Sequence, residues 1–139
     1  QRYVAALASV QDSRRLEELT DRLERPARWK GKRVRALHPF SAADSALFKA
    51  VSRGEWAVRG FRNRDLQHLL LEQPASSLQE QRRRSAWVSR QLRLLRAHHL
   101  IQKVPHEHRY HLTAFGRQAI TCVLAAREAT VSDFSSKAA

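Results

Sequence analysis

Apolar residues recur at helical spacing in five stretches of the chain, and each stretch predicts a helix. The first helix begins at Asp12 or Ser13 and ends near Leu23, and residues 3–10 can add an earlier turn. Charged and apolar residues alternate in residues 32–37, which predicts a short strand in a segment otherwise broken by proline and glycine. This part of the chain therefore predicts a helix and a linker with no obvious place in a compact domain. Three roles stay open for the helix: packing on the rest of the chain, dimerisation, or a junction to a further part of a longer protein.

Capping signals mark the second and third helices. Ser41 forms a capping box with Asp44, and Gly54 is a suitable stop after that helix. Asn63 can cap the third helix. The link between these helices alternates as an extended segment through Trp56, Val58 and Phe61. The inward faces of the two helices are expected to hold Leu47, Phe48, Val51, Leu66, Leu69 and Leu70.

Residues 85–113 are the most informative stretch, because they predict a helix followed by a hairpin. The helix spans residues 85–98 and places Val88, Leu92 and Leu95 at positions i, i+4 and i+7 of one face. The hairpin has a strand at Leu100, Ile101 and Val104, a turn at residues 105–108 and a returning strand at residues 109–112. The polar loop at residues 72–82, before the helix, is long, and its Gln and Glu content lets part of it continue as helix.

Thr113 is the expected N-cap of the last helix, whose inward residues are Phe115, Ile120, Val123 and Leu124. Cys122 falls on the same side and is expected to be a small core residue. The division that follows is an N-terminal helical segment (1–24), a basic linker (25–40), the main domain (41–131) and a frayed tail (132–139).

The segment VSRQLRLLRAHHLIQKV, followed by RYHLTAFGRQAI, resembles winged-helix DNA-binding domains, most closely those of the multiple-antibiotic-resistance (MarR-like) regulators. In that family the recognition helix reads VSR-x-L-x-x-L-x-x-x-x-L-I and the entry to the next helix reads Y-x-L-T-x-x-G. The matching positions here are Val88, Ser89, Arg90, Leu92, Leu95, Leu100, Ile101, Tyr110, Leu112, Thr113 and Gly116. The resemblance covers about 40 residues clearly and extends more loosely over residues 41–127. It departs from the family in a longer loop before the recognition helix and in a short wing.

The resemblance and the element order together predict a mainly α fold with a small β-hairpin. This is a winged helix-turn-helix with an extra N-terminal helical segment. The implied function is that of a DNA-binding module, in which one helix enters the major groove and the hairpin lies beside it.

Charge supports a nucleic-acid partner, because the net charge of +13 is concentrated in two segments. Residues 25–38 contain six basic residues and no acid, and residues 82–113 contain eight basic residues and one acid. Together these segments account for the whole excess, since the remaining acids and bases balance.

The expected DNA-binding residues lie on the helix face opposite the core and on the wing. Arg90 and Arg93 are the candidates for reading guanine edges, because Arg presents two parallel donors. The three arginines before the expected helix start, where free N–H groups favour anions, are expected on phosphates. The full set is Arg82, Arg83, Arg84, Ser85, Ser89, Arg90, Arg93, Arg96, Lys103, His106, His108 and Arg109. A secondary basic patch consists of Arg28, Lys30, Lys32, Arg33 and Arg35.

Two other functions stay open. An RNA-binding module would use residues 25–38 to clamp the backbone, and Trp29 would either stack on a base or pack on the domain, with packing favoured. A protein-interaction winged helix would present its Arg face to an acidic partner. Duplex DNA is the partner expected first, with a homodimer or a larger regulatory or mobile-element protein around it.

No catalytic residues, cofactor or metal site are expected in these residues. The sequence has no glycine-rich phosphate loop, no nucleophile motif and no convincing carboxylate pair. His106 and His108 are close enough for a metal, but one cysteine and few nearby carboxylates make such a site weak. The single cysteine and the absence of a signal or membrane segment favour a cytoplasmic, or nucleoid-associated, location without membrane partners. The start at Gln1 and the lack of methionine suggest a piece of a longer protein.

Overall fold

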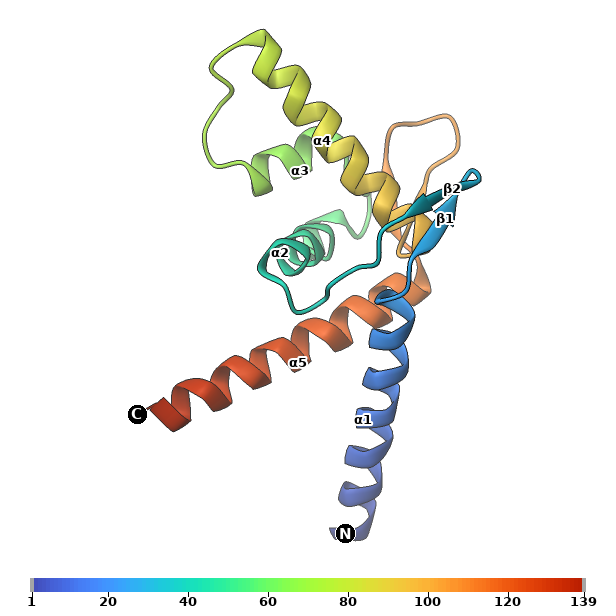
Figure 1. The fold of residues 1–139 in the computed structure, drawn as a ribbon, viewed down its shortest axis with the longest axis vertical. Coiled ribbons are helices and arrows are strands. Elements are labelled where there is room, and N and C mark those ends of the chain that lie inside the picture. Colours follow the sequence, from blue (N-terminus) through green and yellow to red (C-terminus); the bar gives the residue numbers. More distant parts are fainter. Residues whose placement is uncertain (1, 139) are drawn as a thin grey trace.

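A computed structural model describes the backbone of residues 2–138 and the side chains of residues 13–130. The described chain is mainly helical and carries two small antiparallel hairpins, as the sequence predicts in part (Figure 1). Its elements are α1 (Arg2–Leu23), β1 (Ala27–Trp29), β2 (Lys32–Val34), α2 (Ala42–Val51), the 3₁₀ turn η1 (Gly54–Trp56), α3 (Asn63–Leu70), α4 (Leu78–Ala97), β3 (Ile101–Lys103), β4 (Tyr110–Leu112) and α5 (Ala114–Ala138).

One hydrophobic core joins α2, α3, α4, β3 and α5. The predicted inward face of α4 is confirmed, since Val88 and Leu95 are fully buried and Leu92 is nearly so. Ile120 and Val123 of α5 are also fully buried, as predicted. The core therefore occupies one face of α4 and leaves the opposite face in solvent.

The start of α5 is held tightly against the strand that follows α4. Thr113 is the predicted N-cap, and its hydroxyl accepts a hydrogen bond from the Gly116 N–H at 2.8 Å. The Thr113 N–H donates to the Leu100 carbonyl oxygen at 3.0 Å. A Cβ atom at Gly116 would overlap that same oxygen, so only glycine fits here.

The N-terminal helix is longer than the sequence predicts, and of the roles left open for this segment the structure shows packing on the rest of the chain. α1 begins at Arg2, so the predicted start at Asp12 or Ser13 is wrong; the side chain of Asp12 lies outside the described residues. The end of α1 enters the core through Leu23, and Leu37 and Pro39 after the hairpin are also fully buried. The Leu37 N–H donates to the Leu23 carbonyl oxygen at 2.9 Å, which closes this segment onto itself.

The expected basic linker contains a hairpin, whereas the sequence predicts a single strand at residues 32–37. β1 and β2 pair antiparallel with Ala27 opposite Val34. The turn between them is Lys30–Gly31, and both residues have positive φ, 51° and 79°. This is the two-residue turn geometry that suits right-twisted hairpins.

Three local predictions around α2 and α3 need correction. Gly54 does not stop α2, which ends at Val51, and instead starts the 3₁₀ turn. The link to α3 is mostly turn, with Val58 exposed and only Phe61 pairing in an extended bridge with Tyr110. Asn63 is the first residue of α3 and not its cap, because Arg62 takes that place and its N–H donates to Asp65.

The ends of the two longest C-terminal helices also differ from prediction. α4 begins at Leu78, seven residues before the expected start, because Ser77 caps it by accepting from the Glu80 N–H at 3.1 Å. α5 continues as helix to Ala138, where the sequence predicts a frayed tail from residue 132. Within residues 2–138, no helix combines the length and the apolar run needed to cross a bilayer.

Candidate nucleic-acid interface

The exposed face of α4 is cationic and free of acids over its C-terminal half. Ser89, Arg90 and Arg93 are exposed on the side opposite the buried residues of that helix. None of the ion pairs among the described side chains involves Arg90 or Arg93. Both guanidinium groups are therefore available to an anionic ligand.

The three arginines predicted before the helix start lie inside α4, so the expectation that they sit at free backbone N–H groups is wrong. Arg82 and Arg83 are exposed on its second turn. Arg84 is engaged within the chain: it forms an ion pair with Glu80 at 2.8 Å and donates to the Gln73 carbonyl oxygen. Arg84 thus fixes the loop before α4 and is not a free phosphate contact.

Glu80 organises the true start of α4. Its carboxylate accepts hydrogen bonds from the Ser76 hydroxyl and the Ser76 N–H, at 2.5 and 2.7 Å. These bonds, together with the ion pair to Arg84, lower the pKa of Glu80 to about 2. The N-terminus of α4 is therefore occupied by this cap, and the predicted cluster of arginines does not lie there.

A groove of about 390 Å³ separates the start of α3 from α4 and the second hairpin. Asn63 crosses its floor and donates from Nδ2 to the Ser85 carbonyl oxygen and the Ser89 hydroxyl, both at 3.0 Å. The rest of the lining is mostly polar or basic: Arg62, Arg64, Gln67, Leu92, His108 and Tyr110. Sequence reasoning missed Arg62 and Arg64, although their place beside a helix start was a usable signal.

The β3–β4 hairpin carries the predicted wing residues at and beside its turn. β3 and β4 pair with Ile101 opposite Leu112, which confirms the predicted hairpin. Lys103, His106 and His108 are exposed, and Arg109 is half-buried, 3.9 Å from the Glu107 carboxylate. This hairpin therefore presents basic and imidazole groups at its turn.

Arg96 links α4 to the first hairpin. Its guanidinium carbon lies 4.5 Å from the ring centroid of Trp29, an arrangement typical of cation–π contact. Trp29 is half-buried, so the prediction that it packs on the domain is confirmed. Arg96 is half-buried with it and is less available to DNA than the sequence predicts.

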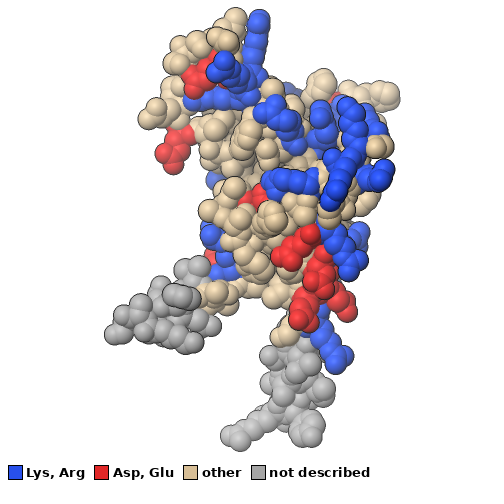
Figure 2. Space-filling view, in the orientation of Figure 1, with Lys and Arg blue, Asp and Glu red and all other residues tan. Residues whose placement is uncertain are grey.

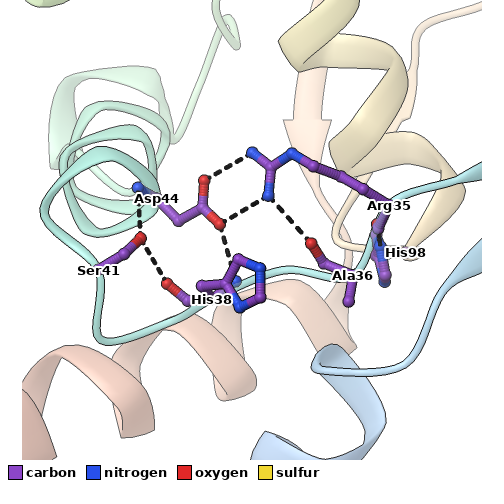
Figure 3. Close-up of polar contacts among 6 residues, drawn as sticks. All are labelled: Arg35, Ala36, His38, Ser41, Asp44 and His98. Carbon is purple, nitrogen blue, oxygen red and sulfur yellow. Dashed lines mark hydrogen bonds and ion pairs between the residues drawn. The ribbon is translucent and has the colours of Figure 1, made fainter.

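The secondary basic patch divides into four exposed cations, of which Lys30 has its Nζ 5.8 Å from the Trp29 ring centroid, and one structural arginine. Arg28, Lys30, Lys32 and Arg33 are exposed. Arg35 is not a free patch residue, because its guanidinium binds Asp44 through two bonds of 3.0 and 2.9 Å (Figure 3). The correction follows from a long-range contact that local sequence cannot indicate.

The Arg35 network fastens the first hairpin to α2 and α4. The buried Asp44 carboxylate also accepts from the His38 N–H at 2.8 Å, and the Ser41 hydroxyl caps α2 by accepting from the Asp44 N–H at 3.2 Å (Figure 3). The predicted cap at Ser41 is thus confirmed, but the Asp44 side chain turns to Arg35 instead of back to Ser41. Desolvation raises the pKa of Asp44, and the bonds from Arg35 and His38 outweigh it, so the pKa lies below its usual value.

His98 closes the network from the end of α4. Its Nε2 lies 2.9 Å from the Arg35 carbonyl oxygen, and since a carbonyl only accepts, Nε2 carries the proton (Figure 3). His98 is buried, and desolvation lowers the pKa of its imidazole below the usual value. The histidine is a neutral structural donor in the fold.

Two remaining predictions concern cysteine and metal. Cys122 is half-buried beside Arg15 and Gln118, at the junction of α1 and α5, and does not belong to the central core. Within the described side chains, no group of three or more His, Cys, Asp or Glu is placed to hold a metal ion.

Basic side chains cluster where the first hairpin meets the end of α4. Figure 2 shows Lys and Arg over the β1–β2 hairpin and the adjoining end of α4, with acidic side chains collected below them over α1. The two basic segments, separate in sequence, thus form one neighbourhood joined at Trp29 and Arg96. No protein-family model, curated protein or solved structure matches this chain.

Proposed function

We propose that this chain is a winged helix-turn-helix module that binds double-stranded DNA. The observation that carries the proposal is α4: one face is buried in the core, and the other presents Arg90 and Arg93, which join none of the ion pairs among the described side chains. The order α2, α3, α4, hairpin and α5 is the order of elements in winged helices. In this function α4 is the recognition helix and the β3–β4 hairpin is the wing.

Size and chemistry agree with this role. α4 has 20 residues and is about 30 Å long. A B-DNA major groove about 12 Å wide admits one such helix. Arg90 and Arg93 then reach guanine O6 and N7, and the Ser89 hydroxyl, which accepts from Asn63, keeps its own proton to donate.

Phosphate contacts come from residues around α4. Arg62 and Arg64 at the start of α3 lie across the groove from α4, and Arg82 and Arg83 lie along its second turn. Lys103 and the histidines of the wing contact the backbone on the other side. Such contacts position the protein, whereas the two base-reading arginines specify the sequence.

A binding titration with sequence-selected duplexes tests the proposal. The double variant Arg90→Ala/Arg93→Ala is expected to weaken binding by at least about 30-fold, since each bidentate Arg–guanine pair contributes about 1–3 kcal/mol. A matched control, Lys49→Ala/Arg127→Ala, removes two exposed or half-exposed charges from α2 and α5 and is expected to change affinity little. Equal affinity of wild type and the α4 variant would contradict the proposal.

Salt and RNA competition separate this function from its alternatives. If about six to ten phosphates are contacted, affinity falls by about 10³–10⁵ between 50 and 200 mM salt. Duplex RNA is expected to compete poorly, because side chains cannot read its deep, narrow major groove. Strong competition by RNA would favour an RNA-binding role. Base stacking on Trp29 is disfavoured, because the Arg96 guanidinium covers one face of the ring.

The wider role follows as part of the same proposal. A module that binds a defined DNA site, with long helices at both ends, suits the DNA-binding part of a larger regulatory or mobile-element protein. Selection of bound sequences from random duplexes reports the site, and a palindromic consensus indicates a homodimer.

A further inference from the structure

The β1–β2 hairpin has one face toward the protein and one face toward solvent. Ala27, Trp29 and Val34 are half-buried on the inner face, and β1 packs against α4. The alternate positions, Arg28 and Arg33, point outward, as the two-residue period of a strand requires. The strand geometry therefore turns the two arginines away from the packing face, whereas Lys32, opposite Trp29 in the register, lies at the exposed edge of the Trp29 side.

The outer face places like charges directly opposite each other. Arg28 and Arg33 are cross-strand partners in the register of the hairpin. Such partners have Cβ atoms about 4.5–5.5 Å apart, and like charges in this position destabilise a sheet. None of the ion pairs among the described side chains involves either residue, and the acids of α1 do not neutralise them.

The turn adds two more cations in a conformation that lysine rarely adopts. Lys30 has a φ of 51°, in the left-handed region favoured by Gly, Asn and Asp, while Lys32 begins the second strand. A non-glycine residue in that region costs about 1–2 kcal/mol. The hairpin thus keeps an unfavourable backbone conformation and a group of four like charges at the same place.

The hairpin is nevertheless held firmly at its base. Arg96 covers Trp29, Arg35 binds the buried Asp44, and His98 donates to the Arg35 carbonyl oxygen. Leu37, just after the hairpin, is fully buried. Its four cations are therefore carried on an anchored element, and binding an anion costs little further ordering of the backbone.

We infer that the β1–β2 hairpin is a second wing, whose Arg28, Lys30, Lys32 and Arg33 bind the phosphate backbone of the same duplex beside the groove entered by α4. The inference rests on the proposed function. Phosphates are the expected ligand because each DNA strand carries one for about every 3.4 Å of helix axis, and such a row can neutralise adjacent like charges. The hairpin adjoins the C-terminal half of α4, so a duplex that lies along α4 reaches it.

Lysine footprinting tests the inference by position. The chain is acylated with and without a saturating duplex of about two helical turns, and modification is read at each lysine by mass spectrometry. Protection of Lys30 and Lys32 supports the second wing, protection of Lys103 reports the β3–β4 wing, and Lys49 on α2 is the unprotected control. Protection of Lys103 without Lys30 and Lys32 overturns the inference and leaves the proposed function standing.

Salt titration gives a second readout. Arg28→Gln/Arg33→Gln is expected to reduce the slope of log affinity against log salt by about 1.8, at about 0.9 per phosphate contact. The matched variant Lys49→Gln/Arg127→Gln also loses two charges and is expected to keep the wild-type slope. Equal slopes for these two variants would overturn the inference, whereas a flat slope for the wild-type chain would remove the proposed function as well.

Lys30→Asn separates binding from folding. Asparagine suits the left-handed turn position better than lysine, so this variant is expected to melt at or above the wild-type temperature. It also removes one cation, so the salt slope is expected to fall by about 0.9. A Lys30→Asn variant that keeps the wild-type salt slope and the wild-type protection of Lys32 would count against a phosphate contact at the turn.

Discussion

The guanidinium of Arg96 lies over the ring of Trp29, 4.5 Å from its centroid. Arg96 belongs to α4, and Trp29 ends the first strand of the β1–β2 hairpin. This contact joins the two basic segments, which are far apart along the chain. It makes the hairpin part of the same surface as the exposed face of α4.

Trp29→Ala is expected to loosen the hairpin from α4 and to lower the free energy of unfolding by about 1–2 kcal/mol, since the ring is half-buried and carries a cation–π contact. Thermal or urea denaturation measures the loss. Trp29→Phe keeps a ring below Arg96 and should lose less. A stability equal to wild type in the alanine variant would show that the contact contributes nothing to the fold.

Asp44→Asn is expected to reduce stability by about 1–2 kcal/mol, because it removes the charge that Arg35 binds while leaving a group that His38 can still reach. The pKa of Asp44 is lowered in the folded chain, so its contribution is complete above the usual value of 3.8 and is lost as the pH falls through the folded pKa. Urea denaturation at neutral and acidic pH measures this. The difference between wild type and the Asn variant should shrink in acid, and a constant difference would refute the assignment.

His98 is expected to make the fold less stable as the pH falls from neutrality. Desolvation lowers its pKa in the folded chain below the usual 6.5, so the unfolded chain binds the proton first and stability declines from about that pH downward. The nearby charges of Arg35, His99 and Asp44 modify the same titration. His98→Gln can still donate to the Arg35 carbonyl oxygen and should flatten the decline. Melting temperatures of wild type and His98→Gln are compared between about pH 5 and about pH 7.5. If both lose the same melting temperature on acidification, His98 is not responsible.

Gly116→Ala is expected to be strongly destabilising, by about 1–3 kcal/mol or more, because the new methyl group would overlap the Leu100 carbonyl oxygen. Neither partner is a flexible side chain, so the start of α5 must move. Gly54→Ala is the matched control, since a methyl group at that position on the 3₁₀ turn would have no atom within 4 Å. Similar melting temperatures for the two variants would contradict the close contact.

Much of the fold could be predicted because local periodicity is strong where the core is. Val88, Leu92 and Leu95 recur at helical spacing, and Thr113 is an unambiguous cap before an apolar helix. The first turns of α4 are largely polar, so periodicity could not find them. Ser77 followed by Glu80 is a capping-box pattern, and that signal marks the true start.

The candidate site was harder to predict than the fold. Exposure of Arg90 and Arg93 follows from the helix period, but the engagement of Arg35 by Asp44 and of Arg96 by Trp29 depends on tertiary contacts. The hairpin could have been recognised from Lys30–Gly31 between two short alternating segments. Its attachment to α4 could not, because no local pattern specifies which distant element a hairpin packs against.

The burial of Leu23, Leu37 and Pro39 determines how far the chain can be shortened from its N-terminus. A polypeptide that starts at Ser41 would leave empty the places of these side chains, and burying each of the two leucines contributes about 1.5–3 kcal/mol. Together the two leucines contribute about 3–6 kcal/mol, a large part of the roughly 5–15 kcal/mol that stabilises a domain. The hairpin segment and the arginine-bearing helix therefore share one core, and a chain shortened to Ser41 is expected to be strongly destabilised.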